Sequence, residues 1–155
     1  MSQFRFEKQR VSASLTLTTG GTVSGCFFVV SPLAQGGPER VGDLLNAYDG
    51  FFPFEDTDGV TRLYNRAHIV LVKLAPGTAE VNLEPGHSVA LERFVGMTLS
   101  TGTIIEGTVF IDRPPGRDRL SDCVRDWKRF LYIVTSTDTL VVNTHHVVEL
   151  VEIST

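Results

Sequence analysis

The stretch LTLTTGGTVSGCFFV, residues 15–29, returns in closely similar form as MTLSTGTIIEGTVFI, residues 97–111. In both copies apolar and polar residues alternate on either side of a Thr-Gly turn, the pattern of a β-hairpin with one buried face. Gly25 and Gly107 stand at matching places in the second strand, where a glycine usually marks a sharp bend or bulge. The sequence therefore predicts two equivalent hairpins, each bent enough to help close a small barrel.

Two further blocks recur in the same order along the chain. RVGDLLNAYDGFFPF, residues 40–54, follows the plan of residues 119–133. LYNRAHIVLV, residues 63–72, follows the plan of VVNTHHVVEL, residues 141–150. Because the blocks keep their order and only the loops between them differ in length, the chain is interpreted as a duplicated module.

The repeat predicts how the 155 residues divide. Module 1 spans residues 1–74, a linker with two Pro-Gly pairs spans 75–88, and module 2 spans 89–155. A module of roughly 70 residues is near the lower limit for a stable core of its own. We therefore expect the two modules to pack together or into an oligomer.

The second block changes from strand to helix periodicity. Its apolar residues fall at i, i+3, i+4 and i+7, which predicts an amphipathic helix of about three turns whose apolar stripe rests on the sheet. These positions are Val41, Leu44, Leu45 and Tyr48 in the first copy, and Leu120, Cys123, Val124 and Trp127 in the second.

The third block is a hairpin followed by an exit strand. The hairpin turns at Asp58-Gly59 in the first copy and near Thr137-Asp138 in the second. Each module therefore reads β-β-α-β-β-β, with a short helix inserted between the second and third strands. The predicted fold class is mainly β, as two tandem five-stranded modules related by a pseudo-two-fold axis.

Composition describes an ordinary globular protein, with 42% hydrophobic and 21% charged residues. The net charge of −4 disfavours a broad nucleic-acid surface, although the short run Arg113, Arg117 and Arg119 leaves room for a small arginine-based site. The start, MSQFRFEKQR, has no apolar signal region, and no stretch approaches the length of a membrane span. We expect a cytoplasmic protein in which Cys26 and Cys123 are buried thiols.

The best local candidates for a site are Asn65 with His68 and their counterparts Asn143 with His146, because both copies keep them. With His145 adjacent, a histidine metal site or a general base is one interpretation. The stronger one is structural, with the asparagine bonding to its own turn and the histidine capping a barrel end. Metal binding needs three or four converging ligands, and no Cys, Asp or Glu keeps metal spacing with these histidines, so we predict no metal and no cofactor.

Arg40 with Asp43, and Arg119 with Asp122, lie three residues apart on the predicted helices. This spacing favours an ion pair on the helix surface, and a ligand-binding arginine is the alternative. No Gly-x-Ser-x-Gly elbow and no Cys/His/Asn arrangement occurs in the chain. We therefore expect a protein that is not an enzyme.

The hairpin blocks resemble the first sequence motif of Sm-like small β-barrels, Gly-x-x-φ-x-Gly-x-φ, where φ is an apolar residue. The matching residues are Gly20, Val23, Gly25 and Phe27, and again Gly102, Ile105, Gly107 and Val109. The segment Leu63–Ile69 resembles the second Sm motif, with Asn65-Arg66 in one copy and Asn143-Thr144 in the other at the place of the family's Arg-Gly pair.

The helix blocks resemble an uncharacterised family of small bacterial domains marked by Arg-φ-x-Asp-φ-φ-Asn followed by an aromatic residue. Residues 40–46 fit this motif, and residues 119–125 fit it with Arg125 in place of the asparagine. The resemblance implies a bacterial, cytoplasmic, adaptor-like protein.

The Sm-like resemblance also implies how such modules assemble, because Sm-like barrels join by pairing the fourth strand of one module with the fifth of the next. We therefore expect a non-enzymatic scaffold or adaptor that forms a homo-oligomer or docks on a bacterial protein assembly. The contact is expected at or near the C-terminal strand Val147–Ile153, with Val148 as a candidate interface residue. The alternative function is binding of RNA or a nucleotide through Asn65, Arg66, Asn143 and the loop at residues 113–119.

Overall fold

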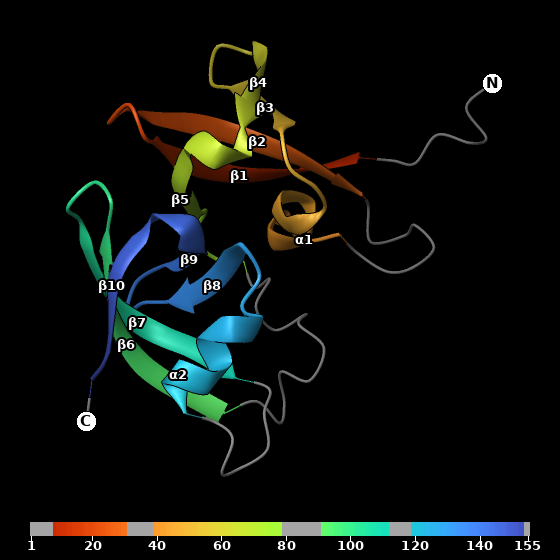
Figure 1. Ribbon diagram of the computed structural model, residues 1–155. Helices are drawn as coiled ribbons and strands as arrows, with labels where there is room; N and C mark the ends of the chain where they lie inside the picture. The colour runs from red at the N-terminus through yellow and green to blue at the C-terminus, as the bar shows by residue number, and fades with distance from the viewer. Residues whose placement is uncertain (1–7, 31–38, 79–90, 112–118, 154–155) are drawn as a thin grey trace.

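The structure of the protein, a computed structural model, describes residues 8–30, 39–78, 91–111 and 119–153 (Figure 1). Within these ranges ten antiparallel strands form one unclosed sheet, and the helices are short. The mainly β fold class predicted from the sequence is confirmed. The linker predicted at residues 75–88 lies largely outside the described residues, and the division into modules stays a prediction.

The elements follow the same order in the two halves of the chain. The first half contains β1 (Lys8–Leu17), β2 (Thr22–Val30), α1 (Val41–Asn46), β3 (Phe51–Asp56), β4 (Thr61–Asn65), the 3-10 helix η1 (Arg66–His68) and β5 (Ile69–Leu74). The second half contains β6 (Leu91–Leu99), β7 (Ile104–Ile111), α2 (Leu120–Cys123), η4 (Val124–Asp126), β8 (Phe130–Val134), β9 (Thr139–Asn143), η5 (Thr144–His146) and β10 (Val147–Glu152).

The strand order in the sheet is β10-β6-β7-β8-β9-β5-β1-β2-β3-β4. The first half contributes the run β5-β1-β2-β3-β4, and the second contributes the equivalent run β10-β6-β7-β8-β9. In both, the exit strand pairs with the long first strand, and the predicted helix lies between the second and third strands. Figure 1 shows the first half above the second, with the β3–β4 hairpin at the top and β10 at the lower left.

The hairpin turns fall where the Thr-Gly pairs predict them. Gly20 and Gly102 have φ values of 94° and 88°, a backbone conformation that is costly for residues with a Cβ. The mid-strand glycines have another role. A Cβ added at Gly25 would lie 2.0 Å from the carbonyl oxygen of Glu55 in β3, so the glycine allows close approach of two strands.

The helices are shorter than the three turns expected from the sequence. Val41 and Leu45 are buried as predicted, but α1 ends at Asn46 and Tyr48 is 72% exposed. The reason is that Arg66 donates hydrogen bonds to the carbonyl oxygens of Leu44 and Leu45, which a longer helix would use for its own next turn.

Two hydrophobic clusters form the core, one in each half. The first is centred on aromatic rings, among which Phe27 packs against Phe52 and Phe54 with ring centroids 5.5 and 5.0 Å apart. The second is aliphatic apart from the partly buried Trp127 at its edge. Among the described residues neither cysteine forms a disulfide, and Cys123 is buried as expected, whereas Cys26 is only partly buried.

Candidate functional site

The two halves are joined by one strand pair, β5 of the first half with β9 of the second. The register places Leu71 opposite Val142, Val72 opposite Val141, and Lys73 opposite Leu140. Because β5 and β9 are the fifth strand of one half and the fourth strand of the other, the duplicated chain builds a fourth-to-fifth-strand junction within itself. We call this pairing the internal junction.

Side chains cross the internal junction in both directions. Val70 of β5 belongs to the hydrophobic cluster of the second half. Phe130 of β8 and Val141 of β9 belong to the cluster of the first half. Since each core is completed by residues of the other half, the two halves are bound by more than main-chain hydrogen bonds.

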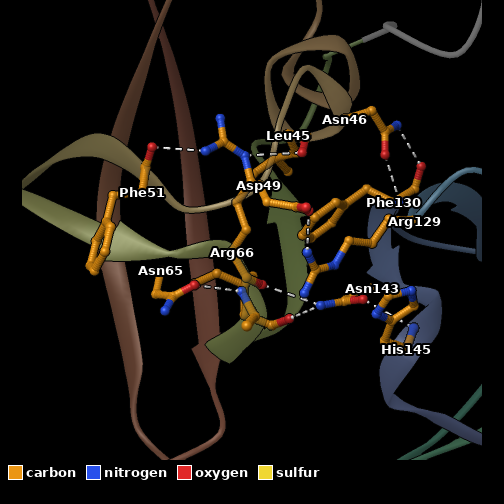
Figure 2. Close-up of polar contacts among 12 residues, drawn as sticks. Leu45, Asn46, Asp49, Phe51, Asn65, Arg66, Arg129, Phe130, Asn143 and His145 are labelled. Carbon is orange, nitrogen blue, oxygen red and sulfur yellow. Dashed lines mark hydrogen bonds and ion pairs between the residues drawn. The ribbon is translucent and has the colours of Figure 1, made fainter.

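Asn143 is the last residue of β9, lies at one end of the internal junction and is completely buried. Its Nδ2 donates to the carbonyl oxygens of Ile69 at 2.9 Å and Arg66 at 3.3 Å, while its Oδ1 accepts from the backbone N–H of His145 at 3.0 Å. Figure 2 shows this amide between the two 3-10 turns that precede β5 and β10. A buried amide must satisfy both its donors and its acceptor, and this position does so.

His146 contacts both halves. Its Nε2 lies 2.9 Å from the carbonyl oxygen of Ala67, which can only accept, so Nε2 carries the ring proton. Its Nδ1 lies 2.8 Å from the Ser100 hydroxyl, and the two groups are hydrogen-bonded. The counterpart His68 makes the equivalent contact to Thr18, at 2.8 Å from Nδ1 to the hydroxyl. Each histidine thus bonds a hydroxyl group in the turn of the first hairpin of its own half. Asn143 bonds the 3-10 turn that follows it.

Helix α1 adds a second set of contacts between the halves. The side chain of Asn46 bonds both the N–H and the carbonyl of Phe130, at 2.8 and 2.9 Å (Figure 2). Beside it, Arg129 pairs with Asp49 at 2.9 Å, and the Tyr132 hydroxyl accepts from the backbone N–H of Gly42. Asn46, the last residue of the Arg-φ-x-Asp-φ-φ-Asn motif, therefore binds the other half of the chain.

Arg66 is the largest of the fully buried side chains. Its guanidinium donates to the carbonyl oxygens of Leu45 and Phe51 at 3.1 and 2.8 Å (Figure 2). It also donates to the carbonyl oxygen of Leu44 at 2.9 Å. The guanidinium lies 5.0 Å from the ring centroid of Tyr48, and its burial lowers the pKa of the group. This arginine therefore fixes the end of α1 to the start of β3.

Arg40 and Asp43 form the ion pair expected from their spacing, at 2.7 Å, and the Arg40 guanidinium lies 5.4 Å from the Tyr132 ring centroid. Burial alone would raise the pKa of the Asp43 carboxyl, but hydrogen bonds from Arg40 and its charge outweigh burial and lower it. The counterpart Arg119 is exposed, and its carbonyl oxygen accepts from the N–H of Cys123 at the start of α2.

Replacing Asp43 by asparagine should cost stability at pH 7 but not in acid. A carboxyl whose pKa is lowered by folding contributes stability that is present above its unfolded-state pKa, about 3.9, and is lost as pH falls through the folded pKa. Because the Asp43 side chain is 39% exposed, we expect a loss of about 1 kcal/mol at most. Urea midpoints at pH 7 and pH 3 measure it. A deficit that persists unchanged at pH 3 would contradict this assignment.

The two ends of the sheet are free edges in the described part of the chain. Strand β4 pairs only with β3 there, and β10 pairs only with β6. In the repeat, Phe51 and Leu63 are the counterparts of Phe130 and Val141, yet they are 60% and 66% exposed instead of 2% and 0%. Val148 of β10, the counterpart of the buried Val70, is 70% exposed. Residues buried at the internal junction are therefore exposed at the free edges.

The sequence pointed to Val148 and missed Phe51 and Leu63. The repeat indicated that these positions matter, because apolar residues occupy them in both copies. The fold was needed to show that they are buried in one copy and exposed in the other. Asn65 shows the same contrast. Its Oδ1 accepts from Ala67 as Asn143 accepts from His145, but its Nδ2 has no partner among the described residues.

The described residues give little support to a metal site, a membrane span or an arginine site. Among the described residues no three His, Cys, Asp or Glu side chains are grouped to hold a metal ion. None of the described helices has the length and apolar character needed to cross a membrane. The loop arginines at positions 113 and 117 lie outside the described residues.

Comparison of this chain with protein-family models, with curated proteins and with solved structures gives no match.

Proposed function

We propose that the protein is a non-enzymatic scaffold or adaptor subunit of a bacterial, cytoplasmic assembly, and that it binds other protein subunits through the free edges of its sheet. In this proposal each half is an Sm-like module. Three features support that likeness, namely the two Gly-x-x-φ-x-Gly-x-φ hairpins, the order of five strands in each half, and the junction of a fourth with a fifth strand.

The observation that carries the proposal is the exposure of Phe51, Leu63 and Val148 at the two free edges. A bare strand edge with apolar side chains is a template for pairing with another chain, and soluble proteins usually protect such edges. Their counterparts Phe130, Val141 and Val70 are all buried at the internal junction, where a neighbouring strand covers them. A partner strand at the free edges would bury the exposed set in the same way.

Binding of RNA or a nucleotide remains the alternative from another class of function. Two of its proposed residues, Arg66 and Asn143, are buried and bonded to backbone groups of the chain. Phosphate recognition requires cationic donors that face solvent. The described residues therefore favour the protein-binding proposal, and RNA binding stays an untested prediction.

Leu63→Lys tests the proposal, because its side chain is exposed in the isolated chain and a lysine there should leave the fold intact. We expect light scattering at tens of micromolar to give a mass above 17.0 kDa for the unchanged protein and a lower mass for the variant. The matched control is Ile104→Lys, which replaces a residue of similar exposure, 68%, in the interior strand β7. This control should keep the assembly.

Two results would contradict edge binding. One is an unchanged protein that stays at 17.0 kDa across the concentration range and has no co-purifying subunit. The other is an assembly that Ile104→Lys dissociates while Leu63→Lys does not. Thermal midpoints of both variants, measured alongside, show whether either substitution acts through unfolding.

A further inference from the structure

The internal junction shows how this chain joins a fourth strand to a fifth, and the same two strand types are left free at its ends. Strand β4 is the first-half counterpart of β9, and β10 is the second-half counterpart of β5. We infer that β4 of one copy pairs with β10 of the next copy, head to tail, in the register of the internal junction. This inference rests on the proposed function and names its partner as a second copy of the chain.

The repeat gives the register of the pairing between copies. Val72 lies opposite Val141 at the internal junction, so their repeat equivalents place Leu150 of one copy opposite Leu63 of the next. Lys73 opposite Leu140 becomes Val151 opposite Arg62. Val151 and Arg62 are both exposed in the single chain, so nothing in the described residues occupies this position.

At the internal junction each half places apolar side chains in the hydrophobic cluster of the other half, and the pairing between copies can do the same. Val70 enters the cluster of the second half, while Phe130 and Val141 enter the cluster of the first. In the head-to-tail pairing Val148 takes the place of Val70, and Phe51 and Leu63 of the next copy take the places of Phe130 and Val141. The most exposed apolar side chains of both edges are thereby buried, each in the core of the other copy.

The polar contacts match as well. Asn143 donates its Nδ2 to the carbonyl oxygens of residues 66 and 69, whose counterparts are Thr144 in η5 and Val147 at the start of β10. Asn65 of the next copy has the same amide, and no described residue of its own chain accepts from its Nδ2. A pairing of β4 with β4 would bring no β10 turn to this donor, so the asparagine favours the head-to-tail arrangement.

The helix contacts do not match, which predicts a weaker junction between copies. Asn46, which bonds the backbone of Phe130, is replaced in the second copy by Arg125. The ion pair of Asp49 with Arg129 has Lys128 and Gly50 at the equivalent places and is lost. The pairing between copies therefore keeps the strand and asparagine contacts but lacks those of the helix, and its extent should rise with protein concentration.

Disulfide cross-linking between Arg62→Cys and Val151→Cys tests the register. Ala75 donates to the Ser12 carbonyl in β1, so by the alternation of an antiparallel strand Lys73 also faces β1 and forms a narrow pair with Leu140. Arg62 and Val151 inherit this narrow pair, whose Cα separation of about 4.5 Å suits a disulfide. Mixing the two single variants under mild oxidation should shift the 17.0 kDa band to twice that mass on a non-reducing gel.

Three controls accompany the mixture. On the non-reducing gel each variant alone should stay at the 17.0 kDa band, as should the unchanged chain, which reports any cross-linking through Cys26 and Cys123. Glu152→Cys mixed with Arg62→Cys should give no dimer, because the next residue along a strand points to the opposite face.

The outcomes separate this inference from the proposed function. A dimer band in the Arg62/Val151 mixture alone supports head-to-tail pairing. If Leu63→Lys dissociates the assembly but cross-links form only within single variants, the pairing is symmetric, and the inference fails while the proposed function stands. If the unchanged chain is a 17.0 kDa monomer without a partner subunit and no mixture cross-links, both fail.

Discussion

Gly25→Ala should destabilise the protein by about 3 kcal/mol, a large fraction of the stability of a typical domain. The added Cβ would lie 2.0 Å from the backbone oxygen of Glu55 and 2.9 Å from the Cα of Asp56. Backbone atoms cannot rotate away as side chains do, so β2 and β3 must separate where Gly25 faces Asp56. Urea unfolding followed by circular dichroism measures the loss.

Gly21→Ala is the matched control, because a Cβ there meets nothing within 4 Å. Its midpoint should stay within about 0.5 kcal/mol of the unchanged protein. Gly107→Ala should fall between the two, since its nearest backbone atom, the Val134 oxygen, is 2.7 Å away. If Gly25→Ala is no more harmful than Gly21→Ala, the close approach of β2 and β3 does not exist in solution.

Local pattern was sufficient to predict the strands and turns of this protein. Alternation around Gly20 and Gly102 requires only neighbouring residues, and those hairpins form as expected. The strand order is likewise repeated because the same local instructions occur twice. The helical spacing of apolar residues did not predict the length of α1, because that length depends on a hydrogen bond between Leu44 and Arg66, which are far apart in the chain.

The candidate site was less predictable for a related reason. Asn65 and Asn143 have equivalent positions and make the same local bond, so no sequence pattern says that one is buried and the other partly exposed. That difference arises because β5 can pair with only one further strand, and in a single chain this strand is β9. The sequence thus identified the two asparagines, while the fold decides which of them is buried.

Arg66→Met should also destabilise the protein by about 3 kcal/mol, through lost hydrogen bonds and with little change in volume. The substitution removes the guanidinium donor from each of the carbonyl oxygens of Phe51, Leu44 and Leu45, of which Leu44 keeps the Ala47 N–H at 3.4 Å. These groups connect the end of α1 to β3, and an unpaired buried carbonyl costs about 1–3 kcal/mol. Relief from burying the guanidinium charge offsets part of that cost, as its lowered pKa indicates.

The matched control for Arg66→Met is Arg10→Met, whose side chain is 64% exposed and pairs with Glu55 on the surface. Such pairs contribute about 0–1 kcal/mol, so its urea midpoint should barely change. Amide hydrogen exchange adds a local test, because loss of the Arg66 bonds should speed exchange in α1 before it affects β6 and β7. Equal midpoints for the two variants would show that the guanidinium is not held by the carbonyls, and that α1 ends for another reason.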